Sequence, residues 1–246
     1  MNGFQRFGIE RLSPSALNLW RANPGLYALR YLGKFFDQAG PGAWRGTAVE
    51  KGLHSWFIKQ NGDEAYARAL EAFEKEAQGL ADNETDTERN NIAPMLDMAI
   101  KATEHLPAPY FGAQARVEYV FQDVDVPVIG FIDFILEDGS IFDLKTTKAC
   151  PSEPKADHAR QVALYMAGRN CPGSLLYVTA KKSAHYPISE ELKDSALESM
   201  RRDALSLQAF LNGQKDPISA IRSLPMNDDD FRWSEAATAK LQEIAA

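Results

Sequence analysis

Residues Val128 to Lys148 read VIGFIDFILEDGSIFDLKTTK, and this stretch decides the fold. Two apolar runs flank a turn sequence that ends in Gly139, which is the pattern of a β-hairpin. The hairpin also carries Asp133, Asp143 and Lys145. Three charged side chains in strands otherwise made of Ile, Phe, Val and Leu are costly to bury without a partner. A metal ion held by the two carboxylates, with the ammonium group beside it, would offset that cost.

The length of the turn decides whether the two aspartates share a face of the sheet. A two-residue turn would pair Asp133 with Leu144 and point it away from Asp143. A three-residue loop over residues 137–139 puts Gly139 at the left-handed position that this loop type favours. That loop pairs Asp133 with Asp143 and brings their Cβ atoms to about 4.5–5.5 Å. We therefore predict the three-residue loop and two aspartates that can share one divalent cation.

The composition is that of an ordinary globular protein, with 45% apolar and 25% charged residues in 246. No apolar run approaches the roughly 20 residues that span a bilayer, and the first residues contain no apolar signal core. We therefore expect a cytoplasmic protein, in a bacterium or a phage-infected host, without membrane contact. The chain contains only Cys150 and Cys171, which excludes a four-cysteine iron–sulfur cluster within it. The net charge of −7 argues against a protein that coats a polyanion wholesale, but it does not exclude nucleic acid.

The order of the expected elements indicates a mixed sheet flanked by helices, an α/β or α+β fold with a helical N-terminal half. Ser13 and Pro14 form a helix start. Two later helices are expected over 63–79 and 84–105, with acidic residues, Glu88 among them, on solvated faces. The remaining expected elements are a strand over 116–121, the hairpin, a helix over 157–169, short strands over 174–180 and 184–188, and a helix over 189–211. We expect one compact domain with three parts, a helical portion over 1–112, a core over 113–214 and a tail over 215–246.

A helix predicted from about Trp44 to Lys59 carries a further candidate for the site. Glu50 and His54 are four residues apart and therefore lie on one face of that helix. Gly46 lies one turn earlier on the same face, where it allows close approach to a sheet or a phosphate. Glu50 and His54 are candidate metal ligands beside the hairpin, and the alternative is a solvated pair on an outer face.

Five motifs occur in one order along the chain, and together they resemble the PD-(D/E)xK nuclease superfamily, in particular its RecB-like branch. That branch includes phage exonucleases and CRISPR-associated nucleases. The motifs are LSPSxLxxW (12–20), G-x-x-x-(H/E) (46–50), G-x-x-D (130–133), D-x-K-T (143–146) and Q-x-x-x-Y (161–165). The resemblance covers about residues 12–165 and implies a restriction-endonuclease-like mixed central sheet. Glu50 occupies the position at which the second motif usually has a histidine, and His54 follows one turn later. The four cysteines that bind the cluster in the CRISPR-associated members are absent.

The resemblance implies hydrolysis of DNA phosphodiester bonds with Mg²⁺ or Mn²⁺, and no iron–sulfur cluster. Catalysis would rest on Asp133, Asp143, Lys145 and Glu50. The expected metal ligands are Asp133, Asp143, the Leu144 carbonyl, Glu50 and His54. DNA contacts are expected from Gln161, Tyr165, Thr146 and Arg45. In this reading the metal polarises the phosphoryl oxygen and acidifies the attacking water, while Lys145 orients that water and offsets the developing charge.

A small free-standing member of this branch suggests an exonuclease in recombination, repair or phage DNA metabolism. Its partners would be DNA and a separate helicase, annealing protein or single-strand-binding protein, and exonucleases of the superfamily also form homo-oligomeric rings. Several alternatives stay open. They are a structure-specific endonuclease, a metal-dependent phosphodiesterase acting on RNA or a nucleotide, a catalytically silent nucleic-acid-binding or assembly module, and a plain salt bridge between Asp143 and Lys145 on a sheet edge.

Overall fold

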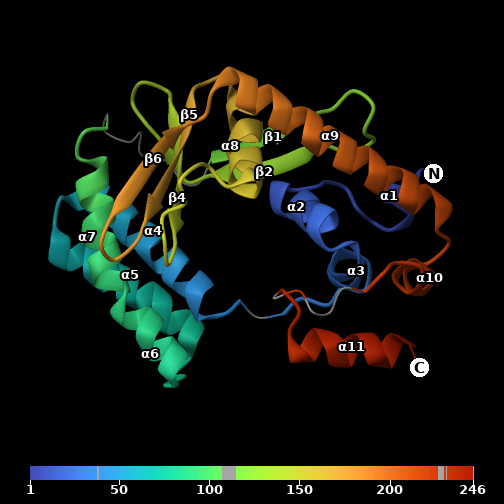
Figure 1. Ribbon diagram of the computed structural model, residues 1–246, viewed down its shortest axis with the longest axis horizontal. Coiled ribbons are helices and arrows are strands. Elements are labelled where there is room, and N and C mark those ends of the chain that lie inside the picture. Colours follow the sequence, from blue (N-terminus) through green and yellow to red (C-terminus); the bar gives the residue numbers. More distant parts are fainter. Residues whose placement is uncertain (38, 107–114, 227–229, 231, 246) are drawn as a thin grey trace.

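The structure is a computed structural model that describes residues 1–37, 39–106, 115–226, 230 and 232–245. Within these ranges the strands form two sheets (Figure 1). One sheet pairs β1 (Ala115–Tyr119) with β2 (Val128–Ile132), and the other has the order β3 (Phe134–Ile135), β4 (Ile141–Thr146), β5 (Gly173–Val178), β6 (Ser183–Pro187). Strands β4 and β5 are parallel, whereas the other neighbouring pairs are antiparallel. The mixed sheet expected from the sequence is therefore confirmed.

The first apolar run of the hairpin is divided between the two sheets at Asp133. Strand β2 ends at Ile132 and pairs with β1, whereas β3 begins at Phe134 and pairs with β4. The sequence indicated one uninterrupted strand here, because every residue on either side of Asp133 is apolar or Gly. The side chain of Asp133 thus lies where the chain changes its hydrogen-bonding partner.

Helices cover both faces of the four-stranded sheet (Figure 1). Helix α8 (Ala156–Arg169) forms the crossover between the parallel strands β4 and β5, as parallel strands require. The long helix α9 (Glu190–Gly213) packs on the outer side of α8. The opposite face of the sheet is covered by helices from the first half of the chain, namely α4 (Pro41–Lys59), α5 (Gly62–Ala77), α6 (Asn83–Asn90) and α7 (Ile92–Thr103).

The single helix predicted over 84–105 is two helices, α6 and α7, divided at Asn91. Pro94 lies in the first turn of α7. Because proline has no N–H, it is tolerated in a first turn but would break the hydrogen-bond ladder of a continuous helix. The apolar periodicity of the segment concealed this break.

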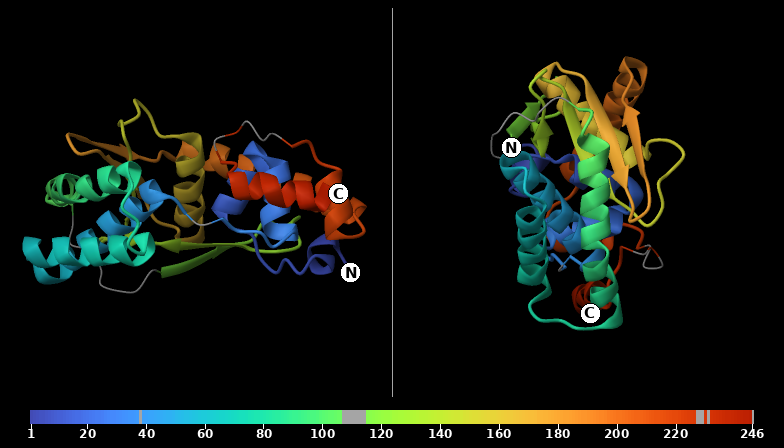
Figure 2. Two further views of the ribbon diagram at one scale, coloured as in Figure 1. Left: turned by 90° about the horizontal axis from the view of Figure 1, so that it is seen from below. Right: turned by 90° about the vertical axis from the view of Figure 1, so that its left-hand side faces the viewer.

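The remaining helices lie at the other end of the elongated molecule (Figure 2). They are α1 (Gly3–Arg6), α2 (Pro14–Ala22), α3 (Pro24–Tyr27), the π-helix η1 (Ala28–Leu32), α10 (Pro217–Arg222) and α11 (Glu235–Ala245). The predicted start of α2 is confirmed, since the Ser13 hydroxyl accepts a hydrogen bond of 3.1 Å from the Ala16 N–H. Leu12 just before it bridges β2, where Ile129 N–H donates to the Leu12 carbonyl at 2.9 Å.

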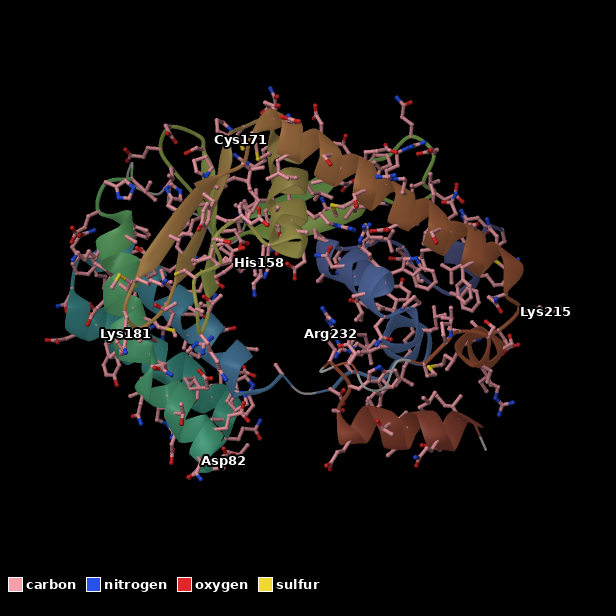
Figure 3. All side chains as sticks on the ribbon, in the orientation of Figure 1. Asp82, His158, Cys171, Lys181, Lys215 and Arg232 are labelled. Atoms are coloured by element: carbon pink, nitrogen blue, oxygen red, sulfur yellow. The ribbon has the colours of Figure 1, made fainter. Side chains whose placement is uncertain are left out.

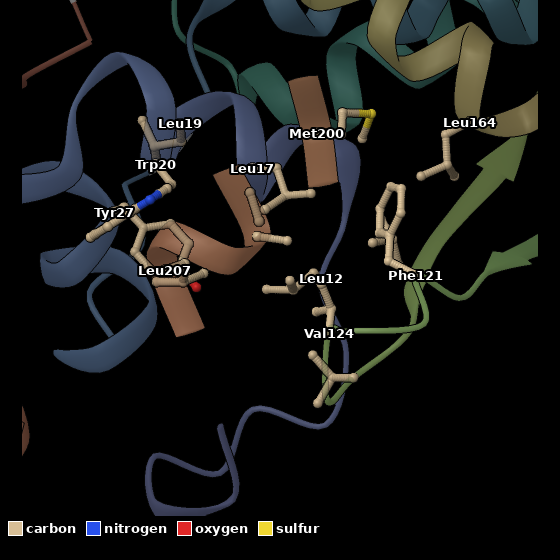
Figure 4. Packing of buried hydrophobic residues seen from close by; sticks show 14 of the residues in the cluster. Leu12, Leu17, Leu19, Trp20, Tyr27, Phe121, Val124, Leu164, Met200 and Leu207 are labelled. Carbon is tan, nitrogen blue, oxygen red and sulfur yellow. The ribbon is translucent and has the colours of Figure 1, made fainter. Parts of the chain in front are cut away.

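The buried apolar side chains form two clusters, one on each side of the hairpin. The first joins residues of the N-terminal helices to β1, β2, α8 and α9, including Leu12, Leu17 and Met200 (Figure 4). The second joins α4, α5 and α7 to β3, β4 and β5, and includes Phe134 and Phe142. The expected domain boundary between 112 and 113 lies outside the described residues.

Two further observations concern the class of protein. Among the described residues no helix is both long and apolar enough to cross a membrane. Cys150 and Cys171 are free thiols.

Candidate active site

The turn of the central hairpin has the predicted three-residue loop. Leu136 N–H donates to the Ser140 carbonyl at 2.8 Å across it, and Gly139 has a φ of +83°. In this register Phe134 pairs with Phe142 and Ile135 with Ile141, and continuing it by one residue beyond the end of β3 puts Asp133 opposite Asp143. The two carboxylates therefore face the same side of the hairpin, as the loop length required.

Asp143 and Lys145 form an ion pair on the face of β4 that α8 covers. Lys145 Nζ lies 2.7 Å from Asp143 Oδ2. Burial alone would lower the pKa of Lys145, but the carboxylates of Asp143, Asp133 and Glu50 outweigh it, and the pKa lies above its ordinary value. The ammonium group therefore stays charged in the field of these three carboxylates.

Asp143 is only 3% exposed, yet within the described part of the chain its Oδ1 accepts no hydrogen bond and its Oδ2 is reached only by the ammonium group of Lys145. Such a group is costly to bury unless its acceptor sites are filled. Its chemistry fits a hard divalent cation, because Mg²⁺ accepts carboxylates, a backbone carbonyl and several waters. Within the described residues no three His, Cys, Asp or Glu side chains converge into one metal-binding group. The structure thus fits a cation held by two aspartates and completed by a carbonyl and water.

A chain of hydrogen bonds connects Lys145 to the Q-x-x-x-Y motif on α8. Lys145 Nζ donates to Gln161 Oε1 at 3.2 Å, and Gln161 Nε2 donates to the Tyr165 hydroxyl at 2.8 Å. The Tyr165 ring lies against Gly130, where an added Cβ would come within 2.3 Å of Cε1. Burial raises the pKa of Tyr165 far above its ordinary value, so that the hydroxyl stays protonated. The glycine of one motif therefore makes room for the tyrosine of another.

Glu50 and His54 occupy different surroundings although they share a helix face. Glu50 is partly buried on α4 and contributes to the negative field at Lys145. The His54 ring stacks on Phe134, with centroids 4.3 Å apart and planes 15° apart. Burial, aided by the charge of Lys51, lowers the pKa of His54 to about 4. Among the described residues, neither side chain completes a three-donor group with the aspartates.

Arg45 and Thr146, expected on the DNA, lie on the other side of β4. Arg45 is 5% exposed, forms an ion pair with Glu88 and donates to Thr146 Oγ1 at 3.2 Å. Thr146 follows Lys145 by one residue and so points to the opposite face of the strand, toward α4. Glu88, expected on a solvated surface, is buried as the partner of Arg45. The prediction for Glu88 was wrong, because the acidic character of its segment concealed one inward-facing carboxylate.

Gln161 lines two pockets, one of which also contains Asp133 and the other Lys145. The Asp133 pocket has a volume of about 480 Å³, and its walls include Asp133, Gln161, Tyr165, Tyr31, Phe131 and Arg11. The Lys145 pocket has a volume of about 560 Å³, and its walls include Lys145, His158, Arg21, Arg30, Arg160 and Arg232. Consecutive residues of the π-helix η1, Arg30 and Tyr31, thus line different pockets. π-Helical turns are frequent at functional sites.

His158 is a candidate site residue that none of the five sequence motifs includes. It lies one helical turn before Gln161, and Figure 3 shows it projecting into the space that Arg232 enters from the other side. Tyr177 Oη accepts from the Lys155 N–H at 3.1 Å and lies 2.9 Å from His158 Nδ1. We assign the tyrosine O–H as donor to Nδ1, which leaves an N–H on Nε2. Burial, reinforced by the charge of Lys145, lowers the pKa of His158 and favours this neutral form.

Comparison with known proteins agrees with this geometry. The family model described as the PD-(D/E)XK nuclease superfamily matches residues 11–245. The chain belongs to that superfamily. Among curated proteins, no sequence matches this chain.

Two solved structures resemble the chain. A crystal structure of a protein from Eubacterium rectale, provisionally described as an exonuclease, superimposes with a TM-score of 0.59 at 13% identity, and the match covers 94% of this chain and 88% of that one. At this identity the likeness shows the fold alone. A crystal structure of SSO0001 gives a TM-score of 0.37 at 16% identity over 65% of this chain and 75% of that one, and carries no argument.

Proposed function

We propose that this superfamily member is a Mg²⁺- or Mn²⁺-dependent deoxyribonuclease that works as an exonuclease. The observation that supports the proposal best is the buried Asp143 carboxylate, which pairs with Lys145 through Oδ2 and whose Oδ1 accepts no hydrogen bond from the described residues. A silent copy of the fold has no need to keep the three charges of Asp133, Asp143 and Lys145. A salt bridge on a sheet edge does not account for it either, because β4 is an interior strand between β3 and β5.

In this proposal Asp133, Asp143 and the Leu144 carbonyl hold the cation, and Glu50 completes its ligands through water. We leave out His54, because its ring is stacked on Phe134. A bound divalent cation would supply a polarised phosphoryl oxygen and a water of lowered pKa.

The protein's own groups have distinct parts in the proposed reaction. The Lys145 ammonium orients the attacking water and offsets negative charge that develops on the phosphate. Gln161 holds the ammonium in place and is itself held by Tyr165. The arginines of the Lys145 pocket offer contacts to phosphates, which fix the position of a strand without reading its sequence. We therefore assign recombination, repair or phage DNA metabolism as the context, with a helicase or a single-strand-binding protein as a separate chain.

The decisive experiment compares end-labelled linear DNA with closed circular DNA in Mg²⁺, Mn²⁺ and EDTA. We expect degradation of the linear DNA alone, lost in EDTA and lowered by two or more orders of magnitude in Lys145→Ala. Lys101→Ala, which removes an exposed lysine on α7, serves as the matched control and should keep full activity. Cleavage of the circle would indicate an endonuclease, and labelled RNA in parallel tests the other polymer. Equal degradation by Lys145→Ala would remove Lys145 from the mechanism.

A further inference from the structure

The Asp133 pocket adjoins the proposed catalytic centre but differs in chemistry from its neighbour. Asp133, Gln161 and Tyr165 form part of its wall, so that a group bound there lies next to the bond that would be cut. Arg11 is the single Lys, Arg or His among the described residues that line it. The Lys145 pocket, in contrast, contains four arginines besides Lys145 and His158, and Asp157 is the single acidic residue among the described residues that line it. Arg21 and Arg160 form ion pairs with Asp203, and Arg232 forms one with Asp230. The charges favour phosphates in the Lys145 pocket and a less charged group in the Asp133 pocket.

Aromatic rings from two elements line the Asp133 pocket. Phe131 is 44% exposed, which is unusual for a large apolar side chain within a sheet, and it lies on β2 two residues before Asp133. Tyr31 reaches the pocket from η1, and its ring is stacked on the buried Tyr27 with centroids 4.7 Å apart. An exposed phenylalanine beside a fixed tyrosine offers apolar area for a flat ring.

Polar groups complete the wall of the pocket. The hydroxyls of Ser13 and Ser15 lie 3.0 Å apart at the start of α2, and both residues line the pocket. Hydroxyls both donate and accept hydrogen bonds and can therefore pair with the edge of any base. Stacking on aromatic side chains is likewise tolerant of sequence, because every base has a π-face.

We propose that the Asp133 pocket binds an unpaired nucleobase of the strand that is cleaved, so that the substrate is single-stranded DNA or a separated strand end. This inference rests on the nuclease function proposed above. A base that is paired and stacked within a duplex cannot enter a side pocket, since it must first leave the stack. The neighbouring Lys145 pocket then receives the phosphates of the same strand.

The test uses a single-stranded, end-labelled oligonucleotide in which one base is replaced by an abasic site. Removing a stacked base costs roughly 1–3 kcal/mol, so that wild-type cleavage next to the abasic site should slow roughly 5- to 150-fold. Phe131→Ala should cut the intact oligonucleotide more slowly than the wild type does. In this variant the ratio of the cleavage rates of intact and abasic DNA should fall to near one. Tyr66→Ala removes an equally exposed ring on α5, outside the pocket, and should keep the full difference. Phe131→Leu keeps apolar area without a ring and should behave like Phe131→Ala.

Two outcomes overturn the inference while the nuclease function stands. One is metal-dependent cleavage at equal rates with and without the base. The other is an abasic penalty that Phe131→Ala retains at full size. Should the wild-type protein cut no DNA at all, the nuclease function fails, and base binding is then measured separately with a 2-aminopurine-containing oligonucleotide in EDTA. Fluorescence quenching by the wild type but not by Phe131→Ala supports the pocket, and equal fluorescence in the two overturns it.

Discussion

Gly130→Ala tests the connection between the sheet and the proposed catalytic lysine. An added Cβ would lie 2.3 Å from Tyr165 Cε1, whereas ordinary contacts are 3.4–4 Å, so the ring must move by about 1 Å. That ring holds Gln161, and Gln161 holds Lys145. We expect a stability loss of about 1–3 kcal/mol from overpacking. Because a displacement of this size at a catalytic group costs roughly 100-fold, we also expect nuclease activity to fall by about that factor.

The assay pairs thermal denaturation with digestion of labelled single-stranded DNA well below the melting temperature. Gly168→Ala is the matched control, because Gly168 lies on α8, the helix of Tyr165, but away from the catalytic centre. The Cβ added at Gly168 would also lie 2.3 Å from its nearest neighbour, Val117 Cγ2. We expect this control to lose similar stability and to keep its activity. Adding Tyr165→Val to Gly130→Ala relieves the contact but removes the hydroxyl that holds Gln161, so the activity should stay low. Full activity of Gly130→Ala, or an equal loss in Gly168→Ala, would refute the reasoning.

Three further predictions concern other parts of the site. Arg45→Met should lower the free energy of unfolding by about 3–5 kcal/mol, since it leaves Glu88 buried without its partner, whereas Arg68→Met on an exposed face should change it little. His54 has a pKa of about 4 in the folded chain against 6.5 ordinarily, so the unfolded chain binds its proton more readily and stability falls as the pH drops from 6.5 toward 4. His54→Phe should remove about 1–2 kcal/mol of that decline, allowing for partial exposure, in melts across this range. His158→Phe should weaken binding of single-stranded DNA roughly tenfold in a titration, because the Nε2–H that would donate to a phosphate is lost.

The hairpin register followed from the sequence because strand alternation and loop length leave few choices. Gly139 favoured one loop, and that loop alone put the two aspartates on one face. The same alternation places Thr146 opposite to Lys145, so its contact with Arg45 could have been anticipated. The burial of Glu88 could not have been anticipated, since nothing in its polar segment marks the side of the helix that faces Arg45.

The pockets could not be predicted from the sequence, because their walls are formed by residues that are distant along the chain. Tyr31, Phe131 and Tyr165 come from η1, β2 and α8, and each alone is indistinguishable from a core aromatic. His158 shares a helix with Gln161, but its role depends on Tyr177 of β5. Motifs pointed to the candidate reactive groups, whereas only the packing of the elements shows what surrounds them.

The division of the strand at Asp133 has a consequence for cation binding. Ile132 before it packs in one hydrophobic cluster and Phe134 after it in the other, and strands β4 and β5 contribute side chains to both clusters. Asp133 therefore lies where the chain crosses from one cluster to the other. A cation shared by Asp133 and Asp143 would tie this crossing point to β4, so that cation occupancy and local rigidity would rise together.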